Sequence, residues 1–142
     1  MASTNSEASS AQQAQVAAAA PTWKLESIAP VFCTGNLERW LEHYKALGFE
    51  VSSYGNEYGY AILDGVKVIH AQVNPYHSPT LTDGCAYLYV DDADAVFAVW
   101  SVAPHTRRHL APRNTEYGLR EGGHIDPDGN LIRYGSRIRN AE

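Results

Sequence analysis

The chain carries its clearest structural information in one stretch, residues 117–134, which reads Tyr-Gly-Leu-Arg-Glu-Gly-Gly-His-Ile-Asp-Pro-Asp-Gly-Asn-Leu-Ile-Arg-Tyr. Its centre, Asp126-Pro127-Asp128-Gly129, is typical of a tight turn, because proline fixes φ and glycine accepts a positive φ. The segments 117–125 and 131–134 on either side are therefore predicted to be strands.

The residues before this hairpin predict a strand and a helix. Segment 85–90 has the composition of a strand, and Asp92 can cap a helix directly after it. The apolar face of that helix repeats at helical spacing: Ala93, Val96, Phe97 and Trp100. Pro104 ends the helix, and residues 105–117 are poorly patterned, so we expect one short strand there at most.

The first half of the chain shows the same order of elements. Segment 28–33 is predicted to be a strand, with Pro30 indicating an edge or a bulge. Asn36 can cap a helix that ends near Gly48 and whose apolar face is formed by Leu37, Trp40, Leu41 and Tyr44. The dipeptide Asp64-Gly65 favours a two-residue hairpin turn, and strands are expected at 49–54, 58–63 and 66–73.

The two halves align with an offset of 56 residues, which places Leu41 on Phe97 and Tyr44 on Trp100. We therefore predict an α+β fold of two β-α-β-β-β modules with curved mixed sheets. The modules span about 25–74 and 84–138, with a linker at 74–84. A curved sheet with one helix leaves its concave face bare, so another module or a ligand must cover that face.

The composition restricts the classes of function. Residues 1–22 are rich in Ala, Ser and Gln, so we expect a disordered tail there and a single domain over 23–138. The net charge of -5 argues against a nucleic-acid partner. The two cysteines lack zinc-site spacing, and no segment is typical of a membrane span or a secretory signal. We expect a cytoplasmic protein with no nucleic-acid or membrane partner.

Two motifs resemble those of the vicinal-oxygen-chelate superfamily. The helix opening at 35–44, Gly-Asn-Leu-Glu-Arg-Trp-Leu-Glu-His-Tyr, followed by Leu47-Gly48-Phe49, is similar to the first helix of that superfamily. The run at 117–121 that leads to Asp126-Pro127-Asp128-Gly129 resembles the signature of its bleomycin-resistance branch. The resemblance covers roughly residues 25–138. It implies a homodimer in which modules of both chains, with or without strand exchange, complete two equivalent crevices.

Metalloenzymes of this superfamily, such as glyoxalase I and ring-cleaving dioxygenases, bind their metal through four strand positions. The resemblance places those positions at Ala29, His70, Cys85 and Arg133. Alanine cannot ligate and arginine is a permanent cation, whereas catalytic divalent sites usually need three or more protein ligands. We therefore expect no metal, no cofactor and no catalytic residues, and we interpret Cys85 as a small packing residue.

Strand alternation groups several candidate ligand-binding residues on common faces. Tyr87 and Tyr89 share a face, where they either contact a flat polar ligand or fill the core. His70 either hydrogen-bonds a ligand or is satisfied within the sheet. An inward-facing Arg133 needs a partner, which is either Glu121 or an anionic group of the ligand.

The resemblance adds three further residues. Tyr58 falls at the place of an aromatic residue that contacts drug, although cross-strand packing explains it equally well. Tyr117 and Arg120 belong to the signature, and Arg120 could equally pair with Glu121 as a structural clamp. The complete predicted ligand-binding set is Tyr58, His70, Tyr87, Tyr89, Tyr117, Arg120 and Arg133.

The function that the resemblance implies is non-catalytic binding and sequestration of a bleomycin-like glycopeptide antibiotic, which would give resistance or self-protection. One alternative is an enzyme of the same superfamily that acts on a small metabolite, with or without a metal. Another is a binder of a different small molecule, such as a sensor.

Overall fold

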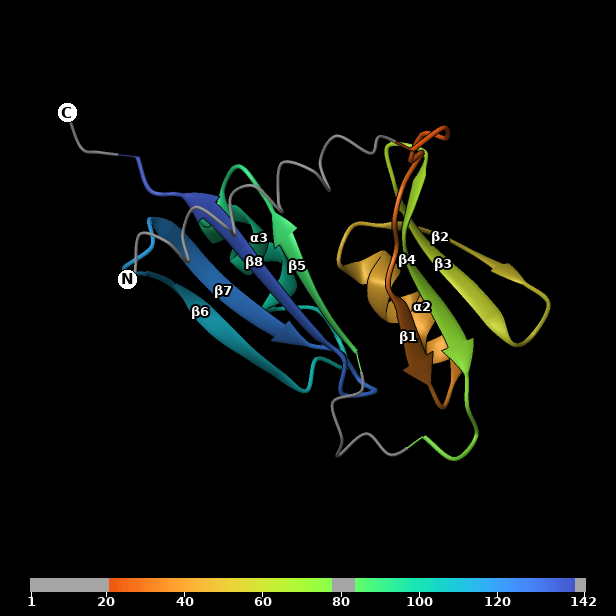
Figure 1. The fold of residues 1–142 in the computed structure, drawn as a ribbon. Coiled ribbons are helices and arrows are strands. Elements are labelled where there is room, and N and C mark those ends of the chain that lie inside the picture. Colours follow the sequence, from red (N-terminus) through yellow and green to blue (C-terminus); the bar gives the residue numbers. More distant parts are fainter. Residues whose placement is uncertain (1–20, 78–83, 140–142) are drawn as a thin grey trace, which may run out of the picture.

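Two similar modules make up the computed structural model, which describes residues 21–77 and 84–139 (Figure 1). The first module contains β1 (Val31–Thr34), α2 (Leu37–Ala46), β2 (Glu50–Tyr54), β3 (Tyr58–Leu63) and β4 (Val66–Val73). The second contains β5 (Cys85–Tyr89), α3 (Ala93–Trp100), β6 (Arg108–Asn114), β7 (Leu119–Ile125) and β8 (Leu131–Arg137). The predicted α+β class and the internal repeat are therefore confirmed. The predicted tail at 1–22 lies outside the described residues except for its last two, as does most of the linker.

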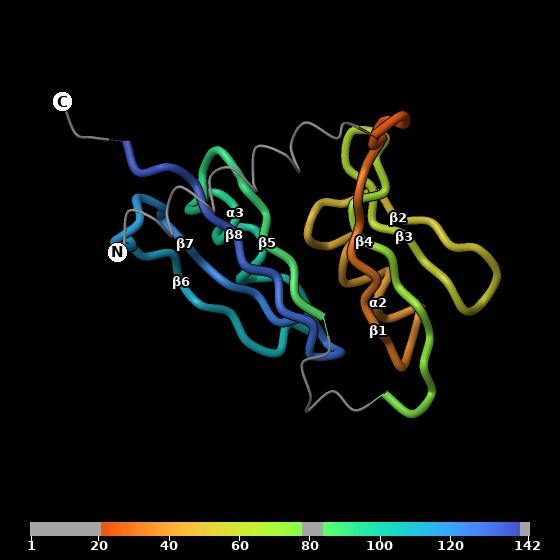
Figure 2. Tube along the Cα trace, viewed as in Figure 1, coloured from red at the N-terminus to blue at the C-terminus, as the bar shows by residue number. Residues whose placement is uncertain are grey.

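The two sheets have the same topology. Their strand orders are β1-β4-β3-β2 and β5-β8-β7-β6. In each sheet the first strand pairs in parallel with the last one, and the other pairings are antiparallel, so both sheets are mixed as predicted. The trace in Figure 2 places β5, an edge strand of its sheet, opposite the chain that leads into β1.

The helices begin where the capping residues predict. The side chain of Asn36 accepts the backbone N–H of Arg39 at 3.0 Å, and that of Asp92 accepts the N–H of Ala95 at 3.1 Å. Each oxygen satisfies a backbone donor that would otherwise lack a partner at the helix start. Gly48 follows α2 at φ +106°, a left-handed conformation that glycine adopts without strain.

The hairpin between β3 and β4 also follows local sequence rules. Asp64 and Gly65 both have positive φ, 50° and 77°, as a two-residue turn between twisted strands requires. β1 is shorter than predicted and starts at Val31, because Pro30 has no N–H to donate to a ladder. β6 is longer than predicted, with seven residues and a bulge between Leu110 and Arg113.

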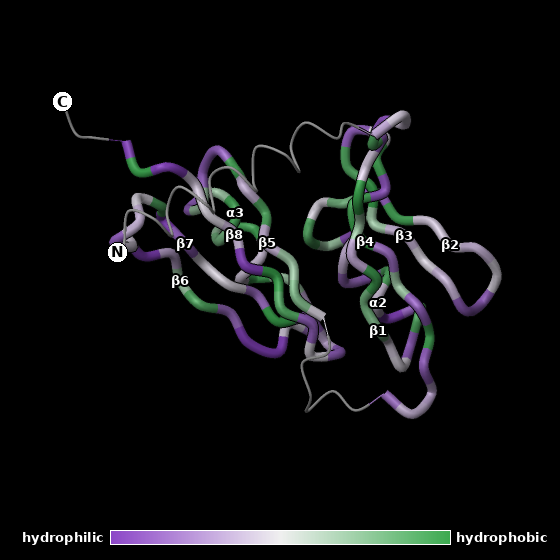
Figure 3. Tube along the Cα trace, in the orientation of Figure 1, coloured by the Kyte–Doolittle hydropathy of each residue, from purple (hydrophilic) through white to green (hydrophobic). Residues whose placement is uncertain are grey.

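Each helix covers one face of its own sheet and leaves the other face bare (Figure 1). Side chains on the helix side are buried, among them Phe32, Ala61, Ile69, Ala71, Ile132 and Tyr134. The alternate residues point to the other side and keep part of their surface exposed. We call these bare surfaces the open faces. Figure 3 shows that hydrophobic residues continue along β5, which lies at the edge of one open face.

The Asp-Pro-Asp-Gly turn joins the second module to the first. Asp126 accepts the backbone N–H groups of Asp128 and Asn130, both at 2.9 Å, which fixes the turn itself. The carboxylate of Asp128 accepts the hydroxyl of Thr34 at 2.7 Å and a guanidinium N–H of Arg39 at 2.9 Å. The signature turn therefore holds the start of α2 in place, which is a structural role.

Candidate functional site

Four side chains on the open face of the second module form what we call the Glu121 cluster: Tyr87, Tyr117, Glu121 and Arg133. Oε2 of Glu121 accepts the hydroxyls of Tyr87 and Tyr117, each at 2.8 Å. Oε1 accepts Nη2 of Arg133, and the same guanidinium lies 5.6 Å from the ring centroid of Tyr87. Three predicted site residues thus converge on one carboxylate, and Glu121 is the partner of Arg133.

The electrostatics of this cluster fix its protonation state near neutral pH. Burial alone would raise the pKa of Glu121, but hydrogen bonds from Tyr117, Arg133 and Tyr87 outweigh it and hold that pKa below its ordinary value. Burial and the hydrogen bond to Glu121 raise the pKa of Tyr87 to about 12. The carboxyl is therefore ionised while both tyrosines keep their protons, so each hydroxyl donates and orients its ring.

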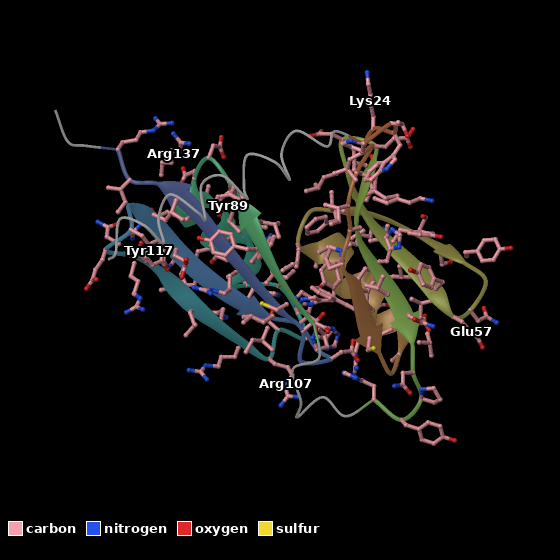
Figure 4. All side chains as sticks on the ribbon, in the orientation of Figure 1. Lys24, Glu57, Tyr89, Arg107, Tyr117 and Arg137 are labelled. Atoms are coloured by element: carbon pink, nitrogen blue, oxygen red, sulfur yellow. The ribbon has the colours of Figure 1, made fainter. Side chains whose placement is uncertain are left out.

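The same face exposes aromatic surface beside the cluster. Tyr89 is 80% exposed and Tyr117 is 62% exposed, and Figure 4 shows them on the same sheet, Tyr89 on β5 and Tyr117 toward β7. The ring centroids of Tyr87 and Tyr89 are 4.9 Å apart. Tyr87 lies over Gly135, where an added Cβ would come within 2.1 Å of its hydroxyl oxygen. Glycine at this position therefore leaves room for the Tyr87 ring.

A second aromatic group, which we call the His70 cluster, lies on the open face of the first module. It consists of Tyr58, Tyr60 and His70. The hydroxyl of Tyr58 is hydrogen-bonded to Nδ1 of His70 at 2.9 Å, and the rings of Tyr60 and His70 meet edge to face at 5.0 Å between centroids. The ammonium of Lys67 lies 4.0 Å above the ring of Tyr60. Nδ1 of His70 is thus bonded within the sheet, and the ring of Tyr58 packs edge to face against the imidazole of its cross-strand neighbour.

Arg120 belongs to neither cluster. Successive residues of a strand point to opposite faces, so Arg120 lies on the helix side while Glu121 lies on the open side. The guanidinium pairs with both carboxylate oxygens of Asp94 on α3, at 2.7 and 3.0 Å, and also donates to Asn114 at 3.2 Å. The clamp role predicted for Arg120 is correct in kind, but its partner is Asp94 and not Glu121.

An apolar cleft of about 590 Å³ is lined by residues of both modules. One wall is formed by residues 28–30 with Leu63, Val68 and Ile69, and the other wall by residues 85–90. Tyr87 and Tyr89 belong to the second wall, so the cleft is continuous with the open face that carries the Glu121 cluster. Cys85 also lines the cleft and is exposed, which corrects its interpretation as a packing residue.

The four positions that correspond to metal ligands in the superfamily enzymes do not fit a divalent metal. Ala29 has no ligating atom, and the Arg133 guanidinium is ion-paired with Glu121. His70 is bonded to Tyr58 at the Nδ1 atom. Across residues 21–77 and 84–139, no group of three or more His, Cys, Asp or Glu side chains is placed to hold a metal. Nor is any helix in this part of the chain long and apolar enough to cross a membrane.

Comparisons with known proteins identify the fold. No protein-family model matches the chain. No curated protein matches it either. Among solved structures, a bleomycin resistance determinant encoded on the transposon Tn5 has a TM-score of 0.70 at 16% identity, covering 81% of this chain and 100% of that one. The fold that the motifs predict is thus confirmed.

Proteins of different function share this fold. A bleomycin-binding protein from Streptomyces verticillus, solved with copper(II)-bleomycin, has a TM-score of 0.66 at 18% identity and covers 82% of this chain and 100% of that one. A glyoxalase-related enzyme from Clostridium phytofermentans has a TM-score of 0.69 at 13% identity, with coverages of 84% and 100%. Similarity at these identities establishes the fold, and the function must be argued from the site.

Sequence reasoning missed two members of the clusters as site residues. The sequence predicts Glu121 only as an ion-pair partner of Arg133 or Arg120, yet it also accepts two tyrosine hydroxyls. Tyr60 is absent from the predicted set, although it alternates with Tyr58 on one face of β3. The signal that could have identified both is the strand period of two residues, applied to every polar and aromatic side chain of a strand and not only to the signature.

Proposed function

We propose that this protein binds and sequesters a bleomycin-like glycopeptide antibiotic without changing it chemically. The observation that carries the proposal is the set of tyrosines on the open face of the second module. Tyr87, Tyr89 and Tyr117 expose ring surface there, and two of their hydroxyls are held by Glu121. Aromatic rings whose hydroxyls are already hydrogen-bonded are held in place and can stack on a flat heteroaromatic group. Each stacked ring contributes about 1–3 kcal/mol to the binding free energy.

The other proposed contacts come from the first module, at Tyr58 and His70. The helix of the first module leaves their open face uncovered in a single chain. The segment before β1 also exposes three large apolar side chains, those of Trp23, Leu25 and Ile28. Large exposed apolar side chains that gather in one segment favour a protein interface. A homodimer that brings the His70 cluster of one chain to the Glu121 cluster of its partner would form two equivalent crevices. The net charge of -5 would assist the approach of a cationic drug.

Calorimetry with bleomycin tests this proposal. We expect binding at two sites per dimer and a loss of affinity in Tyr89→Ala, whose exposed side chain contributes little to folding. Tyr76→Ala is the matched control, because Tyr76 is 93% exposed and lies outside both clusters. Absence of heat from the wild-type protein at high micromolar drug would overturn the proposal, and so would equal losses in the two variants.

An enzyme acting on a small metabolite is the second candidate, because the glyoxalase-related enzyme matches this fold about as well as the binding proteins do, with a TM-score of 0.69. Elemental analysis of purified protein tests the metal-dependent form of this alternative. A stoichiometric divalent metal would favour the enzyme over a binding protein.

A further inference from the structure

The guanidinium of Arg133 is only partly used by the protein. Its side chain is 45% exposed, and one Nη2 group donates to Glu121. Within the described part of the chain, none of its remaining N–H groups has a hydrogen-bond partner. Arginine presents its donors in a planar fork that matches oxygen acceptors, so the free edge of this guanidinium is a site for a carbonyl or carboxylate oxygen.

Arg133 does not line the apolar cleft itself, but the ring of Tyr87 connects the two. Its guanidinium lies above the ring of Tyr87, and Tyr87 also lines the apolar cleft between the modules. A volume of about 590 Å³ is within the range of small-molecule sites. A ring system that enters from the cleft and stacks beside Tyr87 would therefore present its edge to Arg133.

A cationic group finds little free acceptor capacity at the same place. Oε2 of Glu121 accepts two tyrosine hydroxyls, and Oε1 accepts Arg133. The Glu121 side chain is only 12% exposed, so an ammonium has little access to the remaining lone pair of Oε1. The charge of Arg133 itself opposes a second cation nearby.

We propose that the cleft and the Glu121 cluster together bind an aromatic ring system that carries an oxygen acceptor, a carbonyl or a carboxylate, and reject rings that carry a cation. This inference rests on the proposed small-molecule binding and specifies which chemical group of the ligand this site recognises. In a glycopeptide drug, an uncharged carbonyl-bearing segment would lie here, and the cationic tail would lie elsewhere. Glu121 is then a positioning residue, because it orients Arg133 and two aromatic rings without contacting the ligand.

Three small probes of matched shape test the chemistry in the wild-type protein: 2-naphthamide, 2-naphthoate and 2-naphthylmethylammonium. Their dissociation constants are measured by NMR titration of ¹⁵N-labelled full-length chain, which detects millimolar binding. We expect both oxygen-bearing probes to bind at least about tenfold more tightly than the ammonium, as one charge-assisted hydrogen bond predicts. Shifts should centre on β5 and β8. Equal affinities, a preference for the ammonium or no binding of any probe would overturn the inference.

Two arginine variants then assign the effect to one residue. Arg133→Gln should weaken 2-naphthamide binding by about tenfold. Arg108→Gln removes the same charge from an exposed position on β6 and should change nothing. Arg133→Lys keeps the charge but loses the planar fork, so it should recover only part of the affinity. Thermal unfolding checks that each variant is folded, and equal affinities in Arg133→Gln and Arg108→Gln would contradict the assignment.

The bleomycin titration distinguishes a failure of this inference from a failure of the proposed function. If bleomycin binds but the probes show no preference for oxygen, the inference fails and drug binding stands. If the probes behave as expected but bleomycin does not bind, the site reads oxygen-bearing rings of another origin and the antibiotic proposal fails.

Discussion

A buried pair of histidines makes the stability of this protein sensitive to acid. His43 on α2 and His124 on β7 are both fully buried, and their Nε2 atoms lie 2.9 Å apart. Nδ1 of His43 lies 2.8 Å from the carbonyl oxygen of Pro104, which can only accept, so this nitrogen carries a proton. His43 Nε2 must then accept from the N–H of His124, and both rings are neutral. A proton added to His43 would set two N–H donors against each other, and a proton added to His124 would charge its buried Nδ1, which has no hydrogen-bond partner among the described residues.

The size of the effect follows from linkage. Burial, with smaller contributions from His43 and His109, lowers the pKa of His124 from 6.5 to about 3. The unfolded chain therefore takes up a proton before the folded protein does as the pH falls. The stability that neutral His124 provides is complete above pH 6.5 and is lost progressively toward pH 3. At pH 5 the loss is about 2 kcal/mol, at about 1.4 kcal/mol per pH unit.

Groups around His43 both raise and lower its pKa. Burial lowers the pKa of His43 as well, and the hydrogen bond to Pro104 opposes that effect. His105 and Arg39 lower the pKa of His43 further, while Asp128 raises it. His43 therefore adds to the acid sensitivity in the same direction as His124.

Urea unfolding at pH 7 and pH 5 measures this sensitivity. Gln at position 124 can still donate to His43 Nε2 but does not titrate, so His124→Gln should cost about 1 kcal/mol at pH 7. Its loss of stability between pH 7 and pH 5 should be about 2 kcal/mol smaller than that of the wild type. If wild type and His124→Gln lose the same stability between the two pH values, the reasoning is refuted.

Two further substitutions test the packing described above. Gly135→Ala should displace the Tyr87 ring, since the new Cβ would lie 2.1 Å from the hydroxyl oxygen. The variant should lose about 1–3 kcal/mol of unfolding free energy in urea and part of the bleomycin affinity. Unchanged NMR signals from Tyr87 would argue against this placement of the ring. Asp128→Ala should cost about 3 kcal/mol because it removes the acceptor of Thr34 and Arg39, whereas Asp128→Asn keeps one acceptor oxygen and should cost less. Wild-type stability of Asp128→Ala in the same assay would show that the junction does not depend on this carboxylate.

Local rules predicted most of the fold. Helix caps and tight turns depend on neighbouring residues only. The caps at Asn36 and Asp92 are therefore where the sequence predicts them, and the turn at Asp64-Gly65 gives β3 and β4 their predicted bounds. β6 was underestimated because most of its side chains are exposed and its pairing is interrupted by a bulge. An exposed edge strand has no apolar alternation, and periodicity alone therefore cannot identify it.

Pairings across the chain were harder to predict. The contact between His43 and His124 joins residues 81 positions apart, and nothing local indicates it. One signal was available, because Trp40, His43, Tyr44 and Leu47 share one helix face at spacings of three and four, which marks His43 as buried. The partner of Arg120 could not be read from the signature, since Asp94 lies on a different element.

The signature and the binding chemistry occupy different parts of the second module. Asp126 and Asp128 use their oxygens on backbone, on Tyr44 and on the start of α2, so the turn stabilises the junction whatever the protein binds. A motif with that role is expected wherever the fold occurs, in binding proteins and enzymes alike, and it cannot separate them. The open faces can distinguish binding proteins from enzymes, because their side chains do not hold the junction between the modules. Within the signature run, Arg120 holds the helix while its neighbour Glu121 orders the rings of Tyr87 and Tyr117.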